Sequence, residues 1–251
     1  MDAEEVLAGG NVAAVVVRVG ATVRKPATPA TPAVHALLDH VVAAGFDGAP
    51  RALGLDAAGR QVLEYIPGEL AEMLPAMTSS QLRRVGATIR RLHDATATFA
   101  APPEPRWNVV IPPDRQELIC HNDLAPWNLV CDGDRMVFID WDGAGPGSRL
   151  WDLAYAAQGF VPLAPGGDPT ADGARLRAFV DGYGASEQER LELPPVIEAH
   201  TRGMDELLRA SAVTGAQPWA RLHAEGHADH WGPAADYIGA HLGQWQAALL
   251  G

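Results

Sequence analysis

The stretch from His121 to Asp142, HNDLAPWNLVCDGDRMVFIDWD, constrains the fold more than any other part of the chain. Two short apolar runs, NLVC and RMVFI, lie on either side of DGD, a sequence that favours a tight turn, and together they predict an antiparallel hairpin. Polar residues stand before its first strand and after its second. Because antiparallel strands bring these two ends together, we expect Asp123, Asn128 and Asp140 to converge at one rim.

The side chains expected at this rim suit phosphoryl transfer. Amide and carboxylate oxygens are hard ligands for Mg²⁺, which usually needs only one or two carboxylates plus the substrate phosphates. A separate aspartate can orient a hydroxyl and accept its proton. A second interpretation is a metal hydrolase that uses His121, Asp123, Asp140 and Asp142, but it leaves Asn128 without a role.

The N-terminal part predicts a small antiparallel sheet with one helix. Residues 7–26 form two strands around a short turn, and residues 49–66 form a hairpin that turns at DAAG. Between them, residues 31–45 have a helical apolar pattern. Thr31 suits the N-cap of this helix and Gly45 suits its stop.

The rest of the chain is predicted to be mainly helical. Thr78 with Gln81, and Ser186 with Glu189, have the spacing of capping boxes at the start of two helices. A proline-rich loop, residues 101–116, precedes the hairpin. The fold class is therefore α+β.

A break at PGEL, near Pro67, divides the chain into two parts. Residues 1–67 are expected to form the sheet-containing lobe and residues 68–251 the larger, mainly helical lobe. With 47% apolar and 20% charged residues, the chain has the composition of a globular protein.

The overall composition narrows the choice of partners. A net charge of -12 argues against nucleic acid and fits a cationic ligand, although acidity also keeps a protein in solution. No apolar run approaches the roughly 18 residues of a membrane span. Cys120 and Cys131 make no disulfide framework and the acidic N-terminus lacks a signal peptide's basic start, so we expect a cytoplasmic protein.

On the motifs HNDLAPWN and IDWD, the chain resembles the aminoglycoside phosphotransferase and choline kinase-like superfamily, including its trifolitoxin-immunity-like bacterial group. The resemblance implies a bilobal protein-kinase-like fold that uses ATP and Mg²⁺. Asp123 matches the catalytic aspartate, which orients and deprotonates the acceptor hydroxyl. Asn128 and Asp140 match the two metal-binding residues.

The same resemblance implies supporting roles for three residues. His121 matches a histidine that braces the catalytic loop. Asp142 either touches a second metal ion or faces water. Asp152, in WDLAY, either caps a helix or braces the loop.

The resemblance also places nucleotide-binding residues in the N-terminal lobe. Gly9 and Gly10 lie where such kinases place the loop over the phosphates. Arg24 and Lys25 end the strand that carries the phosphate-contacting lysine, and because they point to opposite faces only one can do this; we favour Lys25. The stretch LEYI resembles the hinge whose backbone binds adenine. Its residues are Glu64, Tyr65 and Ile66.

Two positions depart from the family pattern. Kinases place a glutamate on the helix after the lysine strand to pair with the lysine, but residues 31–45 contain none. The acid present is Asp39, with His35 one turn before it. Asn122 stands where many relatives have glycine, and its side chain either narrows the acceptor site or caps the loop.

These observations predict a phosphotransferase that moves the γ-phosphate of ATP to a hydroxyl of a small cationic molecule, such as an aminoglycoside-like antibiotic or a metabolite. The alternative is a catalytically silent, kinase-like binding protein that confers immunity. The oligomeric state stays open. The C-terminal helices offer acids for a cationic acceptor: Glu187, Glu189, Glu198, Asp205 and Glu206.

Overall fold

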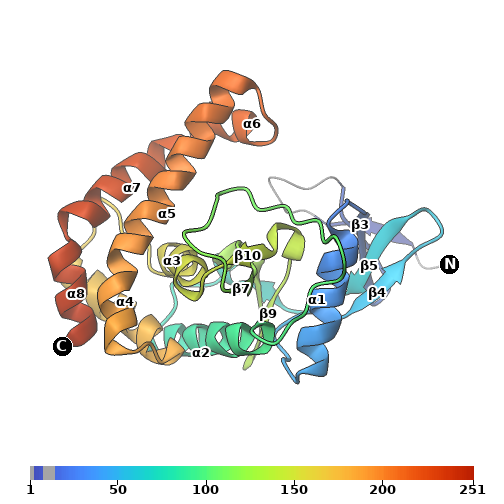
Figure 1. Ribbon diagram of the computed structural model, residues 1–251, viewed down its shortest axis with the longest axis horizontal. Coiled ribbons are helices and arrows are strands. Elements are labelled where there is room, and N and C mark those ends of the chain that lie inside the picture. The colour runs from blue at the N-terminus through green and yellow to red at the C-terminus, as the bar shows by residue number, and fades with distance from the viewer. Residues whose placement is uncertain (1–2, 8–14) are drawn as a thin grey trace.

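The computed structural model describes residues 3–7 and 15–251. A small sheet lies at one end of the molecule, a group of helices at the other, and the predicted hairpin between them (Figure 1). This arrangement confirms the predicted α+β fold, with an antiparallel N-terminal sheet and a mainly helical remainder.

The N-terminal sheet is antiparallel and has the strand order β1-β2-β3-β5-β4. The turn between β2 and β3 contains Gly20 in the left-handed region, φ 58°, where glycine has no steric penalty. In β3, Lys25 lies directly opposite Gln61 of β5. The strands are β1 (Glu4–Val6), β2 (Val17–Val19), β3 (Thr22–Pro26), β4 (Ala52–Leu55) and β5 (Arg60–Glu64).

One helix, α1 (Thr31–Ala43), packs its apolar face against the core. The prediction that Thr31 caps this helix is wrong, because the N-cap is Ala30 and has no side-chain hydrogen bond. Thr31 is already helical, and its hydroxyl accepts a hydrogen bond from the Thr28 N–H at 2.8 Å. Gly45 ends the helix as expected, at φ +83°.

The predicted hairpin is confirmed as β8 (Leu129–Asp132) paired with β9 (Arg135–Phe138). A two-residue strand, β6 (Glu69–Leu70), extends it to three strands. A separate pair joins β7 (Leu118–Cys120) to β10 (Gly145–Gly147). Three short 3₁₀ turns connect these elements: η1 (Ala71–Met73), η2 (Pro126–Asn128) and η3 (Trp141–Gly143).

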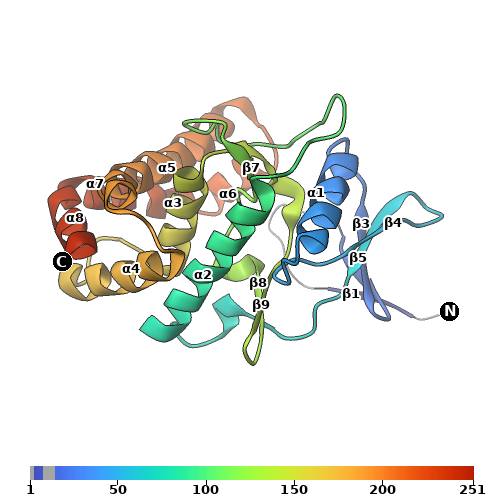
Figure 2. The same ribbon diagram turned by 60° about the horizontal axis from the view of Figure 1, so that its bottom comes forward.

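The helical part begins with α2, which lies beside α4 (Figure 2). Both predicted capping boxes are present, at the starts of α2 and α5. None of the helices described is long and apolar enough to cross a bilayer. The helices are α2 (Ser79–Thr96), α3 (Arg149–Phe160), α4 (Pro169–Tyr183), α5 (Glu187–Thr214), α6 (Trp219–Ala224), α7 (Ala228–Ala240) and α8 (Leu242–Leu250).

Candidate active site

The loop between β7 and β8 and the end of β9 carry the polar residues of the hairpin rim. Asn128 donates from Nδ2 to Asp123 twice, to Oδ2 at 2.8 Å and to the backbone oxygen at 3.0 Å. The Ile139 N–H donates to the Asn128 carbonyl at 2.8 Å, so Asp140 follows directly beside them. Burial raises the pKa of Asp123, and the nearby Asp140 carboxylate also acts to raise it.

His121 is fully buried, and both of its ring nitrogens have partners. Nε2 lies 3.1 Å from the Ile139 carbonyl, which can only accept. Nδ1 lies 3.2 Å from the Asp123 N–H, which can only donate. The ring is therefore the neutral Nε2–H tautomer, and burial lowers its pKa in agreement. His121 ties the loop that carries Asp123 to the end of β9.

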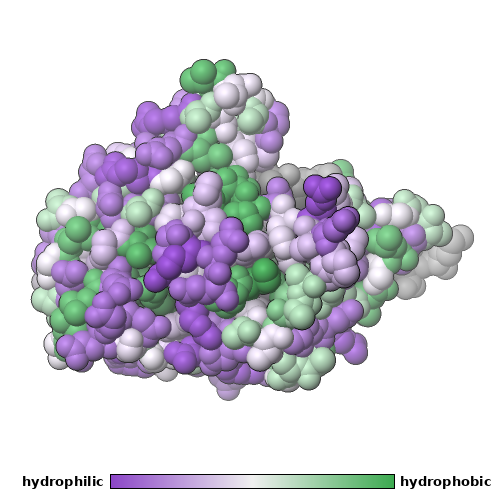
Figure 3. All heavy atoms as spheres, in the orientation of Figure 1, coloured by the Kyte–Doolittle hydropathy of each residue, from purple (hydrophilic) through white to green (hydrophobic). Residues whose placement is uncertain are grey.

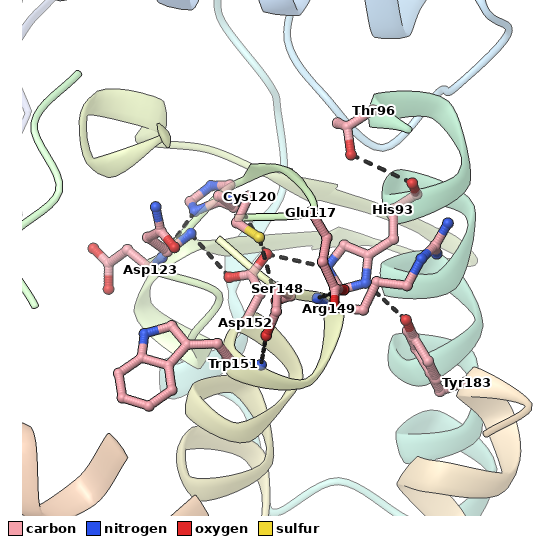
Figure 4. Close-up of polar contacts among 12 residues, drawn as sticks. His93, Thr96, Glu117, Cys120, Asp123, Ser148, Arg149, Trp151, Asp152 and Tyr183 are labelled. Carbon is pink, nitrogen blue, oxygen red and sulfur yellow. Dashed lines mark hydrogen bonds and ion pairs between the residues drawn. The ribbon is translucent and has the colours of Figure 1, made fainter. Parts of the chain in front are cut away.

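Asp152 holds this loop from the other side (Figure 4). Its Oδ2 accepts from the His121 N–H at 3.1 Å and its Oδ1 from the Asn122 N–H at 2.9 Å. His93, from α2, donates from Nε2 to the same carboxylate at 3.1 Å and lies 2.9 Å from the Tyr183 hydroxyl through Nδ1. Asp152 and His93 are completely buried. Asp152 is thus a brace, and Ser148 caps α3 in its place.

Two residues at the rim adopt positive φ angles without being glycine. Asn122 has φ 62° and Asp140 has φ 59°, and asparagine and aspartate are the side chains that tolerate this region best. The Asn122 side chain donates to the carbonyls of Gly143 and Gly145 at 3.1 and 3.3 Å. Asn122 therefore caps the loop after Asp140, at a position whose backbone equally suits glycine.

Lys25 reaches this rim from the N-terminal sheet. Its Nζ lies 2.7 Å from Asp140 Oδ1 and 2.9 Å from Asp142 Oδ2, and the residue is only 6% exposed. Burial acts to lower the pKa of Lys25, but the two carboxylates outweigh it and raise that pKa above its usual value. Arg24 points to the opposite face of β3 and pairs with Asp56 at 3.6 Å.

The remaining nucleotide-binding candidates differ in what they offer. Gly9 and Gly10 lie outside the described residues. Glu64 and Tyr65 donate their backbone N–H groups to the carbonyls of Arg51 and Ala21. Among the hinge candidates, Ile66 is the one whose N–H has no acceptor within residues 3–7 and 15–251, and its side chain packs under the hairpin.

The donor set fits a hard divalent cation. Asn128 uses its amide nitrogen to bind Asp123, so its Oδ1 is the atom that could serve as a ligand, and its backbone oxygen accepts a hydrogen bond from Ile139, the residue before Asp140. His121 has no free nitrogen for a metal. No group of three or more His, Cys, Asp or Glu side chains in the described part of the chain could hold a metal ion. The metal-hydrolase interpretation therefore gains no support.

A cavity of about 460 Å³ opens beside Lys25, Asp140 and Asp142. Its other walls are the β3–α1 connection and residues 106–108 of the proline-rich loop. Arg106 belongs to this wall and is exposed, with no ion-pair partner among the residues that the structure describes. No sequence pattern marked this arginine, because its position depends on how the long loop lies across the molecule.

Aromatic side chains line the other side of Asp123. Burial raises the pKa of Tyr155, and the Asp123 carboxylate, which lies close to the Tyr155 hydroxyl, helps to raise it. Trp231, from α7, stacks on Tyr155 with ring centroids 6.4 Å apart, and Trp127 meets the same ring edge-on. Trp127 is 39% exposed, whereas Trp141 is fully buried in the core. On the face seen in Figure 3, apolar residues gather in the middle, beside the α5–α6 arm.

The acids expected from the C-terminal helices mostly have local partners. Glu198 pairs with Arg202 at 2.7 Å and Asp205 with Arg209 at 2.8 Å, each one turn along α5. Glu189 forms the capping box of the same helix. The side chains next to Asp123, the candidate catalytic residue, are therefore the aromatic group and not these acids.

Known proteins share this architecture. Residues 106–193 match the model of the phosphotransferase enzyme family. A choline/ethanolamine kinase family protein from Mesorhizobium loti has a TM-score of 0.63 at 20% identity, over 99% of this chain and 93% of that one. Amicoumacin kinase, in complex with AMP-PNP and Ca²⁺, has a TM-score of 0.68 at 14% identity, over 94% of this chain and 87% of that one.

The chain therefore belongs to the aminoglycoside phosphotransferase and choline kinase-like superfamily of kinase-like proteins. Within it, the chain is similar to the trifolitoxin immunity protein of Rhizobium leguminosarum bv. trifolii, with 34% identity over 204 residues. That alignment covers 76% of this chain and 77% of the relative. LicA of Haemophilus influenzae is 49% identical over 35 residues, or 14% of this chain.

Proposed function

We propose that the protein is an ATP- and Mg²⁺-dependent phosphotransferase that acts on a hydroxyl of a small, cationic molecule in the cytoplasm. The observation that carries the proposal is the cluster in which Lys25, from the sheet, meets Asp140 beside Asp123 and Asn128. Protein kinases bring these four kinds of group together for phosphoryl transfer.

The nucleotide is assigned to the side of this cluster that faces the sheet. Residues 1–67 form the nucleotide-binding lobe and residues 68–251 the catalytic and acceptor-binding lobe. We assign the phosphates to Lys25 and to Gly9 and Gly10, which lie outside the described residues. The segment from Glu64 to Ile66 borders the adenine, with the Ile66 N–H as donor.

Asp123 acts on the acceptor. Its carboxylate accepts the proton of the acceptor hydroxyl while the hydroxyl oxygen attacks the γ-phosphorus, and ADP leaves with the electrons of the broken P–O bond. The hydrogen bond from Asn128 holds the carboxylate for this task, and the Tyr155 hydroxyl lies close to it. Asn128 Oδ1 and Asp140 would hold Mg²⁺, which would supply neutralisation of the phosphate charge.

The acceptor is assigned to the aromatic group of Trp127, Tyr155 and Trp231. Aromatic faces attract ammonium groups by about 0.5–2 kcal/mol, depending on how far the site is desolvated. This preference supports a cationic acceptor more directly than Glu198 and Asp205 of α5, which already have arginine partners.

The alternative is an immunity protein that binds its target without catalysis, and the similarity to the trifolitoxin immunity protein favours it. A binder needs neither the Asp123–Asn128 hydrogen bonds nor a buried lysine placed on Asp140. The complete cluster therefore supports the enzyme.

Nucleotide binding tests the first half of the proposal. Calorimetric titration with AMP-PNP should show binding that depends on Mg²⁺ and that Asp140→Asn weakens at least tenfold. Asp134→Asn, on the exposed turn of the β8–β9 hairpin, is the matched control and should bind as the unaltered protein does. Absence of Mg²⁺-dependent binding would contradict the assignment.

A further inference from the structure

Lys25 lacks the partner that the kinase pattern provides. The helix that follows its strand, α1, contains no glutamate. Asp39, the acid on that helix, is exposed and makes no ion pair within the described residues. His35, one turn earlier, lies close to Gln61, and its Nε2 is buried without a hydrogen-bond partner in the part of the chain that the structure describes.

A buried ammonium group still needs a counter-charge, because an unpaired charge in the interior is costly. Asp140 and Asp142 provide it at 2.7 and 2.9 Å. Of these two, Asp140 is assigned to Mg²⁺, and a divalent cation competes with the lysine for its oxygens. Asp142 is the carboxylate that stays available to Lys25 when the metal site is filled.

Asp142 is itself held by the sheet. Gln61, completely buried, lies opposite Lys25 in the β3–β5 pair. Its Nε2 donates to Asp142 Oδ1 at 3.4 Å and to the Pro26 carbonyl at 3.2 Å. Neighbours across an antiparallel pair project to the same face. Gln61 thus fixes the carboxylate on the side of β3 where Lys25 emerges.

We propose that Asp142 is the residue that positions Lys25 for the nucleotide phosphates, in place of the missing helix glutamate, and that Gln61 orients Asp142. The expected effect on catalysis rests on the proposed function, whereas the contacts among Lys25, Asp142 and Gln61 do not depend on it. Asp142 is a positioning residue, since it acts through Lys25.

Lys25 is the single lysine of the chain, so lysine acetylation measured on the intact protein reports on this residue alone. Its acetylation by acetic anhydride, followed by peptide mass spectrometry in the absence of nucleotide and metal, measures how firmly the ammonium is held. Asp142→Asn removes one of the two carboxylates that hold the ammonium in its buried position, so the amine is freer to leave that position and meet the reagent. Asp142→Asn should therefore raise the acetylation rate about tenfold.

Three further variants complete this test. Asp142→Glu keeps the charge and should retain slow acetylation. Asp142→Asn combined with His35→Glu places a glutamate on α1, where the kinase pattern has one, and should restore slow acetylation of Lys25. Asp39→Asn, the same exchange at an exposed position of α1, should change nothing. Unfolding midpoints of all variants exclude a general loss of structure.

Kinetics provide the functional consequence. Asp142→Asn should lower kcat roughly tenfold or more with a smaller change in the KM for ATP, and the double variant should recover part of the loss. Unchanged Lys25 acetylation in Asp142→Asn would overturn the inference. If Asp142→Asn speeds the acetylation of Lys25 but the protein binds no ATP, the role of Asp142 in positioning Lys25 stands and the proposed phosphotransferase activity is wrong.

Discussion

Asp152 shows how much one buried residue can organise. Its carboxylate accepts the N–H groups of His121 and Asn122 and a ring N–H of His93, so it fixes the loop that carries Asp123. The sequence placed Asp152 near a helix start but left capping and bracing open. The choice depends on His93, 59 positions away, and no local pattern reports such a distance.

Replacing this carboxylate should destabilise the protein. In Asp152→Asn, an amide NH₂ group replaces an acceptor that faces buried donors, and a buried donor left unpaired costs about 1–3 kcal/mol. We expect the free energy of unfolding to fall by about 2–4 kcal/mol, because a charged partner of His93 is also lost. Urea denaturation measures the loss.

Asp168→Asn is the control for that measurement. Asp168 caps α4 by accepting the Thr170 N–H at 2.9 Å, and asparagine caps a helix about as well as aspartate. Its unfolding free energy should stay within about 0.5 kcal/mol of the unaltered protein. Equal losses in the two variants would show that Asp152 is no more than a helix-terminal acid.

Arg106 provides a second prediction for a single residue. It lines the cavity beside Lys25 and Asp140 and has no acidic partner within residues 3–7 and 15–251. A free cation at this place suits the phosphates. Arg106→Ala should raise the KM for ATP about tenfold or more at low salt, and the difference should shrink as ionic strength rises.

The control for Arg106 is Arg135→Ala. Arg135, at the exposed start of β9, likewise has no ion pair in the described part of the chain, but it lies outside the cavity. Its removal should leave the KM for ATP unchanged. Parallel changes in both variants would point to overall charge and not to a phosphate contact.

Among the elements, the crossing of α2 and α4 depends on two glycines. A Cβ atom on Gly182 of α4 would collide with the backbone of Arg83, and one on Gly86 of α2 with the backbone of Phe179. Backbone cannot move aside as a side chain can. The helices therefore approach more closely than any larger residue allows, which sets the position of His93 on α2.

Gly182→Ala should consequently lower the unfolding free energy by about 2–4 kcal/mol, although alanine favours helices. Gly243→Ala, at the start of α8, meets nothing within 4 Å and should be neutral to about 1 kcal/mol stabilising. Thermal unfolding of the pair separates helix propensity from packing. A stabilised Gly182→Ala would mean that the two helices are not in close contact.

Helix α5 contains a group that links stability to pH. Burial lowers the pKa of His200 to about 4, where its ring lies against Trp151 and Tyr155. An unfolded histidine binds its proton near pH 6.5, so between about pH 6.5 and 4 the unfolded chain holds one proton more. The unfolding free energy should fall by about 3 kcal/mol through this window as the pH falls.

His200→Phe should remove this part of the pH dependence, because phenylalanine fills the aromatic site without titrating. Denaturation curves at several pH values between 7 and 4 measure the difference in slope. The contributions of His121 and His35, whose pKa values burial also lowers, remain in both proteins. An unchanged slope would contradict the assigned role of His200.

For the whole molecule, the sequence predicted the two N-terminal strand pairs with α1 between them, the β8–β9 hairpin and the starts of α2 and α5, because these follow from local apolar periodicity, turn chemistry and capping. The two- and three-residue strands β6, β7 and β10 were missed, because segments so short carry no periodicity. The sequence also did not predict β1, whose three residues are all exposed and show no apolar alternation. It placed the α1 cap one residue late, since the backbone turn at Thr28 decides that start. The family match supports the fold, whereas the individual site roles stay predictions.

The sequence did not predict the side-chain contacts between segments that are distant in the chain. The resemblance pointed to Lys25 but not to Asp142 as its partner, 117 positions away. The aromatic group around Tyr155 joins η2, α3 and α7, which no single pattern connects.

The most direct test of the central claim is ADP release from ATP and Mg²⁺ by the purified protein, with and without a panel of aminoglycosides, other hydroxylated amines and peptides. We predict release that depends on an acceptor and falls at least about 10³-fold in Asp123→Asn, because that variant loses the proton acceptor. It should still bind AMP-PNP. Acceptor-dependent release that persists in Asp123→Asn, or a protein that binds a member of the panel without ever consuming ATP, would contradict the account.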